Sequence, residues 1–273
     1  MVTEEQLPVS RACAAVALSR AAYYRPTNDW QNRDADVIGV LNALIDRHAR
    51  WGFWKCYDRT RLDGHRINHK RLYRVYCLMK LNLPRRTKKR LPPRQPQTMT
   101  VPTIPNHLWA LDFMSDSLCS GRCYRLLNVL DEGMREGLAI EVDTSIPALR
   151  VIRVLENVAA WRGYPSGIRC DNGPEFIAES FVTWCNDHGI AIHYIQPGKP
   201  NQNAFIERFN RTLRNDVLDL YLFETLDEVR EVTHQFLIDY NEHRPHDSLN
   251  GIPPRVFRER LLTAGSSTSE LSA

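Results

Sequence analysis

The sequence predicts an α/β protein in which a mixed β-sheet flanked by helices follows an all-α region and a basic, proline-rich linker. Up to residue 82, apolar residues recur with the period of an α-helix. Residues 83–105 hold six prolines and a run of basic residues, which together favour an extended linker. From residue 107 onward, short apolar runs separated by turn residues precede alternating helical and strand patterns.

The all-α region is expected over residues 1–82. Ser10 and Ser19 are placed to cap two short helices between residues 9 and 24. The apolar spacing predicts another helix over residues 35–50. A further helix is expected to begin after its N-cap, Asn68, with these side chains facing a core: Leu72, Val75, Tyr76 and Met79.

Basic residues occupy another face of that last helix, where Lys70, Arg71 and Arg74 would point outward. Two helices around a glycine-containing turn, here Asp63-Gly64, are typical of a helix-turn-helix that contacts DNA. The alternative is a small helical bundle whose basic face is only solvated.

The α/β core is expected over residues 106–262. Apolar runs at residues 107–116, 123–132 and 137–144 predict three strands that form an antiparallel meander. Further strands are expected at residues 166–171 and 190–195, and helices at 147–162, 178–188, 202–222 and 226–242. The small, polar residues of the tail, 263–273, predict disorder.

Charge is unevenly distributed along the chain, although the net charge is only +4. Residues 51–96 hold fourteen Lys and Arg against two acids, a net charge of +12, whereas residues 97–273 carry a net charge of −8. A block this basic indicates a polyanionic partner such as DNA. The absence of a long apolar run argues against an integral membrane protein, and seven cysteines without a signal sequence indicate reduced thiols in the cytoplasm.

Three acidic residues stand out by their context. Asp112 lies inside an apolar strand, Asp171 follows a short strand, and Glu207 lies inside a helix. Carboxylates are rarely buried unless they are paired or bind metal, and oxygen ligands from separate elements suit Mg²⁺ or Mn²⁺. The pattern alone does not single them out, because four other acids have a similar appearance: Asp116, Asp131, Asp143 and Glu175.

The surroundings of Glu207 add to this interpretation. On a helix, Asn203, Glu207, Arg211 and Arg214 share one face, which would suit both metal and phosphate. The alternative is a solvated amphipathic face with an i,i+4 Glu–Arg pair, worth a few tenths of a kcal/mol.

With these residues in these positions, the sequence resembles the integrase-core transposases of bacterial insertion sequences, specifically the second-reading-frame product of the IS-three family. Thirty-five residues separate Asp171 from Glu207, the interval typical of that family. The resemblance spans nearly the whole chain and rests on these segments: Ile67-Asn-His-Lys-Arg-Leu-Tyr-Arg74, Trp109-Ala-Leu-Asp112-Phe113, Val129-Leu-Asp131-Glu132, Asp171-Asn-Gly-Pro-Glu-Phe176, Pro197-Gly-Lys-Pro-Asn-Gln-Asn203, Glu207-Arg-Phe-Asn210 and Tyr240-Asn-Glu-His-Arg-Pro-His246.

The resemblance implies a ribonuclease H-like catalytic core in which Asp112, Asp171 and Glu207 hold two Mg²⁺ ions, with Mn²⁺ as a substitute. It implies an enzyme that nicks element ends and transfers the 3′ strand to target DNA in the bacterial cytoplasm, at the nucleoid, as a homo-oligomer on DNA. The candidate DNA contacts are Lys70, Arg71, Arg74, Arg85, Arg86, Lys88, Lys89, Arg90, Lys199, Asn203, Arg211 and Arg214.

The sequence departs from the family's pattern at Gly133-Met134 and Asn215-Asp216, neither of which includes a triad residue. It also lacks the leucine zipper of the family's first-frame product, so a first-frame partner or fusion is expected. Alternatives to a transposase are a catalytically inactive DNA-binding repressor and a structure-selective nuclease. Cys56, His65, His69 and Cys77 could form a zinc site. The alternative is that the two cysteines are reduced and partly buried.

Overall fold

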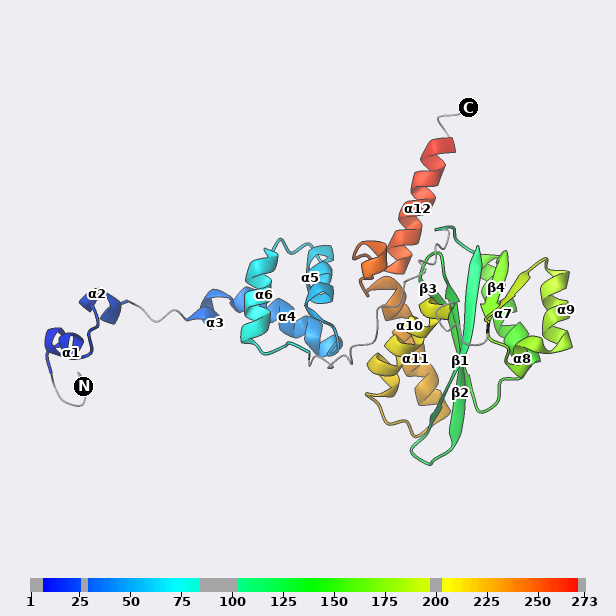
Figure 1. Ribbon diagram of the computed structural model, residues 1–273, viewed down its shortest axis with the longest axis horizontal. Helices are drawn as coiled ribbons and strands as arrows, with labels where there is room; N and C mark the ends of the chain where they lie inside the picture. Colours follow the sequence, from blue (N-terminus) through cyan, green and yellow to red (C-terminus); the bar gives the residue numbers. More distant parts are fainter. Residues whose placement is uncertain (1–6, 26–28, 84–102, 197–202, 270–273) are drawn as a thin grey trace. The chain divides into compact units, whose positions relative to one another are not determined.

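The N-terminal part of the protein is a series of helices. The computed structural model describes residues 7–25, 29–83, 103–196 and 203–269, and the chain forms two compact units, Met1–Ala43 and Leu44–Ala273. The first unit contains α1 (Val9–Ala15), α2 (Arg20–Tyr23), α3 (Trp30–Arg33) and the start of α4 (Ala35–Arg47), as Figure 1 shows.

Helix capping in this unit matches the prediction at one serine and not at the other. The Ser19 side chain accepts a hydrogen bond from Ala22 N, which confirms Ser19 as the N-cap of α2. The prediction for Ser10 was wrong, because the extended backbone at Pro8 starts α1 earlier and places Ser10 inside its first turn.

The second unit begins with a helical pair, α5 (Phe53–Leu62) and α6 (His69–Leu78). Asn68 caps α6 as predicted, and its side chain accepts from Lys70 N at 2.8 Å. The core-facing positions Leu72, Val75 and Tyr76 are buried, whereas Met79 follows the helix end and is half-buried. α5 is the first of the two helices expected around the Asp63-Gly64 turn, and the sequence does not predict its bounds, because its short apolar pattern is interrupted by charges. Most of the predicted linker, residues 84–102, lies outside the described residues.

A five-stranded mixed sheet forms the centre of the α/β core and confirms the predicted fold class. Its spatial order is β3-β2-β1-β4-β5, and it comprises β1 (Leu108–Ser117), β2 (Cys123–Asp131), β3 (Glu136–Asp143), β4 (Gly167–Cys170) and β5 (Ala191–Tyr194). The first three strands form the expected antiparallel meander, and β4 and β5 add in parallel. This register places Asp112 on β1 directly opposite Asn128 on β2.

Helices cover both faces of the sheet (Figure 1). One face carries α7 (Ala148–Arg162), α8 (Pro174–Ile177) and α9 (Glu179–Asp187); the other carries α10 (Ala204–Leu213), the π-helical turn η2 (Arg214–Leu218) and α11 (Leu226–Glu242). Two helix predictions need correction. The helix expected over residues 202–222 changes to a π-helix at Arg214 and ends at Leu218. The short 3₁₀ turn η3 (Asp247–Leu249) is followed by α12 (Pro254–Ser269). This last helix extends into the tail that was expected to be disordered, which is therefore helical as far as Ser269.

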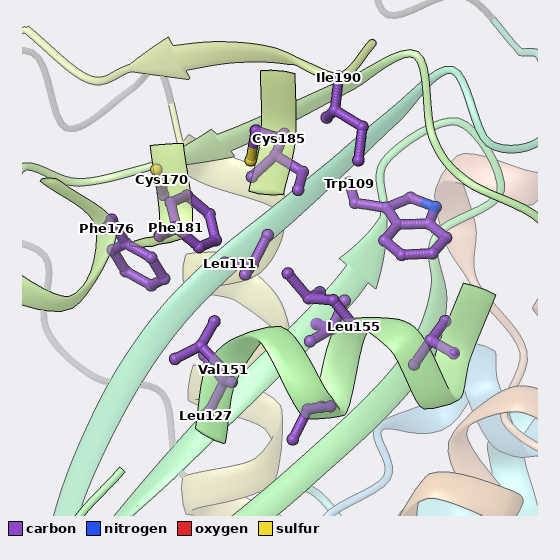
Figure 2. Packing of buried hydrophobic residues seen from close by; sticks show 14 of the residues in the cluster. Trp109, Leu111, Leu127, Val151, Leu155, Cys170, Phe176, Phe181, Cys185 and Ile190 are labelled. Carbon is purple, nitrogen blue, oxygen red and sulfur yellow. The ribbon is translucent and has the colours of Figure 1, made fainter. Parts of the chain in front are cut away.

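Side-chain alternation along β1 divides the interior into two apolar layers. Trp109 and Leu111 pack with α7 and α9 (Figure 2), whereas Ala110 and Met114 pack with α10 and α11. Trp109 is fully buried, as expected for a packing residue. Asp112 belongs to the second set of positions, so its carboxylate lies on the sheet face covered by α10. Within the described residues, no helix is both long enough and apolar enough to cross a membrane.

Candidate active site

Asp112, the first of the three predicted catalytic acids, is half-buried on β1. Its Oδ1 accepts a hydrogen bond from Phe113 N at 2.9 Å, and its Oδ2 accepts one from Asn210 Nδ2 at 2.7 Å. The strand therefore supplies one donor and α10 supplies the other. These two bonds fix the carboxylate between the central strand and the helix that carries Glu207.

The pKa of Asp112 reports what surrounds it. Burial, which is the largest cause, and the negative charges of Asp171 and Glu207 together raise this pKa to about 6, against the two hydrogen bonds, which lower it. The structure thus brings the three predicted acids into one electrostatic neighbourhood, although they come from a strand, a turn and a helix.

Asp171 occupies a tight turn at the end of β4, where the sequence predicts it. Its Oδ1 accepts a hydrogen bond from Gly173 N at 3.0 Å. A Cβ atom added at Gly173 would lie 3.0 Å from Asp171 Oδ1 and 3.4 Å from Glu175 Oε2. A glycine at this position therefore lets the turn close around the carboxylate.

Glu207 lies in the first turn of α10 and is half-buried. The buried neighbours Ile206 and Phe209 anchor this helix in the second apolar layer, which leaves Glu207 on the side that faces Asp112. The positive end of the helix dipole stabilises a carboxylate at this place by a few tenths to about 1 kcal/mol.

Pairing with arginine distinguishes the four similar acids from the three predicted catalytic acids. Each of the other acids forms an ion pair: Asp116 with Arg214, Asp131 with Arg162, Asp143 with Arg150, and Glu175 with Arg125. Within the described part of the chain, Asp112, Asp171 and Glu207 form no ion pair with Lys or Arg. Their negative charge is therefore not neutralised by those side chains.

The donor set suits a hard divalent cation, since all three side chains offer oxygen and a cation would relieve their mutual repulsion. As they stand, no three His, Cys, Asp or Glu side chains of residues 7–25, 29–83, 103–196 and 203–263 lie close enough to hold a metal ion. This statement includes the four residues considered for zinc. Of those, Cys56 is buried, and burial raises the pKa of its thiol to about 11, which disfavours the thiolate that zinc requires.

Sequence reasoning missed the asparagines behind Asp112. Asn210, one helical turn after Glu207, is buried and accepts a hydrogen bond from Asn128 Nδ2 at 2.7 Å while it donates to Asp112. The relay runs from β2 through α10 to the carboxylate on β1. The visible signal was a polar amide at a core-facing position of an amphipathic helix, between Phe209 and Leu213.

It also missed the ion pair that fastens the Asp171 turn to the sheet. Arg125 on β2 pairs with Glu175 on α8, and its guanidinium lies 4.1 Å from the centroid of the Phe113 ring. The Phe113 ring in turn stacks with Phe176 at 5.3 Å. The sequence does not predict this cluster, because its members come from three elements that lie far apart along the chain.

The candidate DNA contacts fall into several groups. Lys70 and Arg211 are exposed, and Arg71 and Arg74 are half-buried. Arg214 donates to Asp116 Oδ2 at 3.1 Å and to Ser115 O at 3.0 Å. Asn203 is only 4% exposed, so its side chain does not present the open polar surface that the helical face predicted. The remaining candidates lie outside the described residues: Arg85, Arg86, Lys88, Lys89, Arg90 and Lys199.

Two family models, both described as Integrase core domain, match this chain at residues 102–200 and 188–254. Together the matched segments contain all three predicted catalytic acids.

Proteins of bacterial insertion elements are similar over nearly the whole chain. The uncharacterized 39.2 kDa protein of IS476 from Xanthomonas euvesicatoria is 37% identical over 264 residues, covering 95% of this chain and 75% of that protein. The uncharacterized 31.7 kDa protein of IS407 from Burkholderia multivorans is 37% identical over 249 residues, covering 90% and 89%. The putative transposase InsK of IS150 from Escherichia coli K12 is 21% identical over 268 residues, covering 93% and 94%.

Among solved structures, the catalytic core domain of HTLV-2 integrase in complex with magnesium is similar at 18% identity with a TM-score of 0.46. The match covers 57% of this chain and 99% of that domain.

Proposed function

Because this chain belongs to the integrase-core family of insertion-element proteins, we propose that it is a DDE transposase that nicks DNA at the 3′ ends of an insertion sequence and joins those ends to target DNA. The observation that supports the proposal is a group of three acids, Asp112, Asp171 and Glu207, which interact electrostatically and form no ion pair with Arg or Lys among the described residues. An uncompensated group of this kind is costly to folding, and a catalytic requirement explains its presence.

In the proposed site, these three carboxylates would hold two Mg²⁺ ions, which would supply Lewis-acid stabilisation of the charge that develops on oxygen. Mn²⁺ would substitute, because it also binds oxygen ligands. Asn210 fixes the orientation of the Asp112 carboxylate through the hydrogen bond that it donates. Arg211, which is exposed on the same helix, and Arg214, which also pairs with Asp116, are the proposed contacts to DNA phosphates.

The reaction proceeds in two displacements at phosphorus. In the first, water attacks the phosphodiester at the element end, the bond to the 3′ oxygen breaks, and a free 3′-hydroxyl results. In the second, that hydroxyl attacks a target phosphodiester, forms a new bond and releases a 3′-hydroxyl of the target. In each step an incoming oxygen replaces the leaving 3′ oxygen on phosphorus: the oxygen of water in the first, which leaves a 5′-phosphate on the flanking DNA, and the freed 3′ oxygen in the second. No serine or tyrosine nucleophile is therefore needed.

The proposed partners are the two element ends and the target DNA in the bacterial cytoplasm. The proposed active form is a homo-oligomer assembled on DNA, which would hold two element ends beside one target. The helical region supplies DNA affinity, and a first-frame helix-turn-helix protein, separate or fused, supplies further recognition.

A strand-transfer assay with a labelled element end and a plasmid target tests this function. With Mg²⁺ or Mn²⁺ we expect both a nicked and a joined product; Ca²⁺ supports binding with little chemistry, because its looser geometry fits the displacement poorly. Nicking without joining would identify a nuclease. DNA binding without either product would identify a non-catalytic repressor, and full activity in EDTA would exclude the metal-dependent reaction.

A further inference from the structure

Aromatic side chains form a continuous surface across α5 and α6. The Trp54 side chain is 61% exposed and the Tyr73 side chain 49% exposed. The ring of Phe53 links them, with its centroid 5.1 Å from that of Trp54 and 4.8 Å from that of Tyr73. His69, one turn before Tyr73 on α6, is also exposed, and its ring centroid lies 6.4 Å from that of Trp54 at an interplanar angle of 27°.

The surroundings of these rings are strongly basic. Residues 51–82 hold eight Lys and Arg against two acids, a net charge of +6. Arg61, Arg66 and Lys70 are exposed on the two helices and the turn between them. The Arg61 guanidinium lies 5.9 Å from the centroid of the Tyr57 ring, so cationic and aromatic groups alternate on this surface.

This combination has a specific physical meaning. Exposing most of a tryptophan to water forgoes the burial that stabilises apolar side chains by about 1.5–3 kcal/mol each. Cations attract the phosphate backbone, and exposed rings stack on base faces. Base faces are available only where DNA is unpaired, since in a duplex they are covered by their neighbours.

We propose that the aromatic surface of α5 and α6, centred on Trp54, is a stacking platform for unpaired DNA bases. This inference deepens the proposed function, because nicking an element end exposes a strand terminus that must be held before joining. The inference rests on the proposed function for one point, that the polymer bound by this surface is DNA. Lys70, Arg61 and Arg66 hold the phosphates, and the Trp54 ring holds a base.

Binding of short DNA to the full-length protein in EDTA tests the platform separately from catalysis. The probes are a fluorescently labelled single strand of about twelve nucleotides and a hairpin duplex closed by a loop, compared at one salt concentration. The variants are Trp54→Ala, Trp54→Leu and Trp54→Phe. The matched control is Trp161→Ala on α7, whose ring is 59% exposed and has the Arg162 guanidinium 5.8 Å from its centroid.

Trp54→Ala and Trp54→Leu should weaken single-strand binding by about 5- to 150-fold, which corresponds to the loss of one base–aromatic stack. Trp54→Leu keeps much of the apolar area, so it controls for folding while it lacks a ring. Trp54→Phe should stay within about threefold of the wild type, and duplex affinity should change little in all three. Unchanged single-strand binding by Trp54→Leu, equal losses for single strand and duplex, or an equal loss in Trp161→Ala would each overturn the platform.

Discussion

Asp112 carries its carboxylate in a half-buried position between β1 and α10, facing two further carboxylates. Its pKa of about 6 in the folded protein lies above the ordinary value of 3.8, so the folded state binds this proton more tightly than the unfolded state does. Protonated Asp112 therefore makes a favourable contribution to the free energy of unfolding at pH 4, and this contribution is lost as the pH rises through 6. At neutral pH the charged group destabilises the metal-free fold by about 2–3 kcal/mol.

Asp112→Asn should consequently stabilise the metal-free protein at pH 8 while it abolishes activity. The amide loses one of the two accepted hydrogen bonds, so the net gain is on the order of 1–2 kcal/mol, or a rise of several degrees in Tm. Thermal unfolding in EDTA at pH 8 and pH 4 measures this, and the gain should vanish at pH 4. A lower Tm for the variant at pH 8 would show that the carboxylate is not held at an electrostatic cost.

Individual residues also mark the limit of sequence reasoning. The sequence predicted the positions of Asp112, Asp171 and Glu207 on a strand, a turn and a helix, but without the family resemblance it did not separate them from Asp116 or Glu175. The separating property is the presence of an arginine partner, which comes from segments up to 98 residues away. Such pairing depends on the register of strands and helices, which a single sequence does not display.

At the scale of elements, α8 follows the Asp171 turn directly and is attached to β2 by the ion pair between Glu175 and Arg125. Arg125→Ala removes the partner of Glu175 and the cation above Phe113, so α8 loses one of its attachments to the sheet, while Phe176 still stacks with Phe113. We expect nicking to fall by about 10-fold or more, because a misplacement of about 1 Å in a catalytic group has effects of this size or larger. The Mg²⁺ concentration for half-maximal activity should rise as well, which a general loss of folded protein would not cause.

Reversing the pair controls for charge. Arg125→Glu with Glu175→Arg retains opposite charges at the same two positions, so it should recover part of the activity that either single reversal loses. If Arg125→Ala kept normal nicking at low Mg²⁺, the ion pair would have no role in placing Asp171.

Elements with a strong period were predictable, and the deviations have local causes. The three meander strands were predictable from their short apolar runs, and α11 from its helical apolar period. In the structure Thr225 also caps α11, and its side chain accepts a hydrogen bond from Glu228 N. The π-helical turn after α10 was not predictable, because Val217 and Leu218 remain buried at a changed spacing that only the packed layer selects. The four-residue α8 is too short to show a period.

For the whole molecule, the uneven charge assigns most of the DNA affinity to residues 51–96. Replacing Arg85, Arg86, Lys88, Lys89 and Arg90 with alanine should flatten the slope of log K against log salt by up to about 4, at about 0.9 for each phosphate neutralised. Residues 99–273 alone should bind DNA weakly, because the acidic remainder of the chain carries a net charge of −8. A titration of duplex affinity against salt measures both. An unchanged slope in the five-residue variant would place the phosphate contacts elsewhere.

Arg211 and Arg214 should behave differently from that block. Both belong to the segment that carries Glu207, so their alanine variants should lose joining and keep most of the salt slope. Arg214→Ala also frees Asp116, which makes Arg211→Ala the cleaner variant. Normal joining at saturating DNA, together with a loss of affinity as large as that of the five-residue variant, would contradict this assignment.

The most direct test of the central claim is strand transfer in Mg²⁺ by Asp112→Asn, Asp171→Asn and Glu207→Gln, beside Asp143→Asn. Asp143 is a suitable control because its partly exposed carboxylate pairs with Arg150, whereas Asp131 is buried against Arg162 and its loss would disturb the fold. The account predicts that each triad variant loses nicking and joining by on the order of 100-fold or more, given the several kcal/mol that metal ions supply, while it retains DNA binding. Asp143→Asn should remain active. Near-normal joining by any triad variant would remove that residue from the catalytic site and contradict the account.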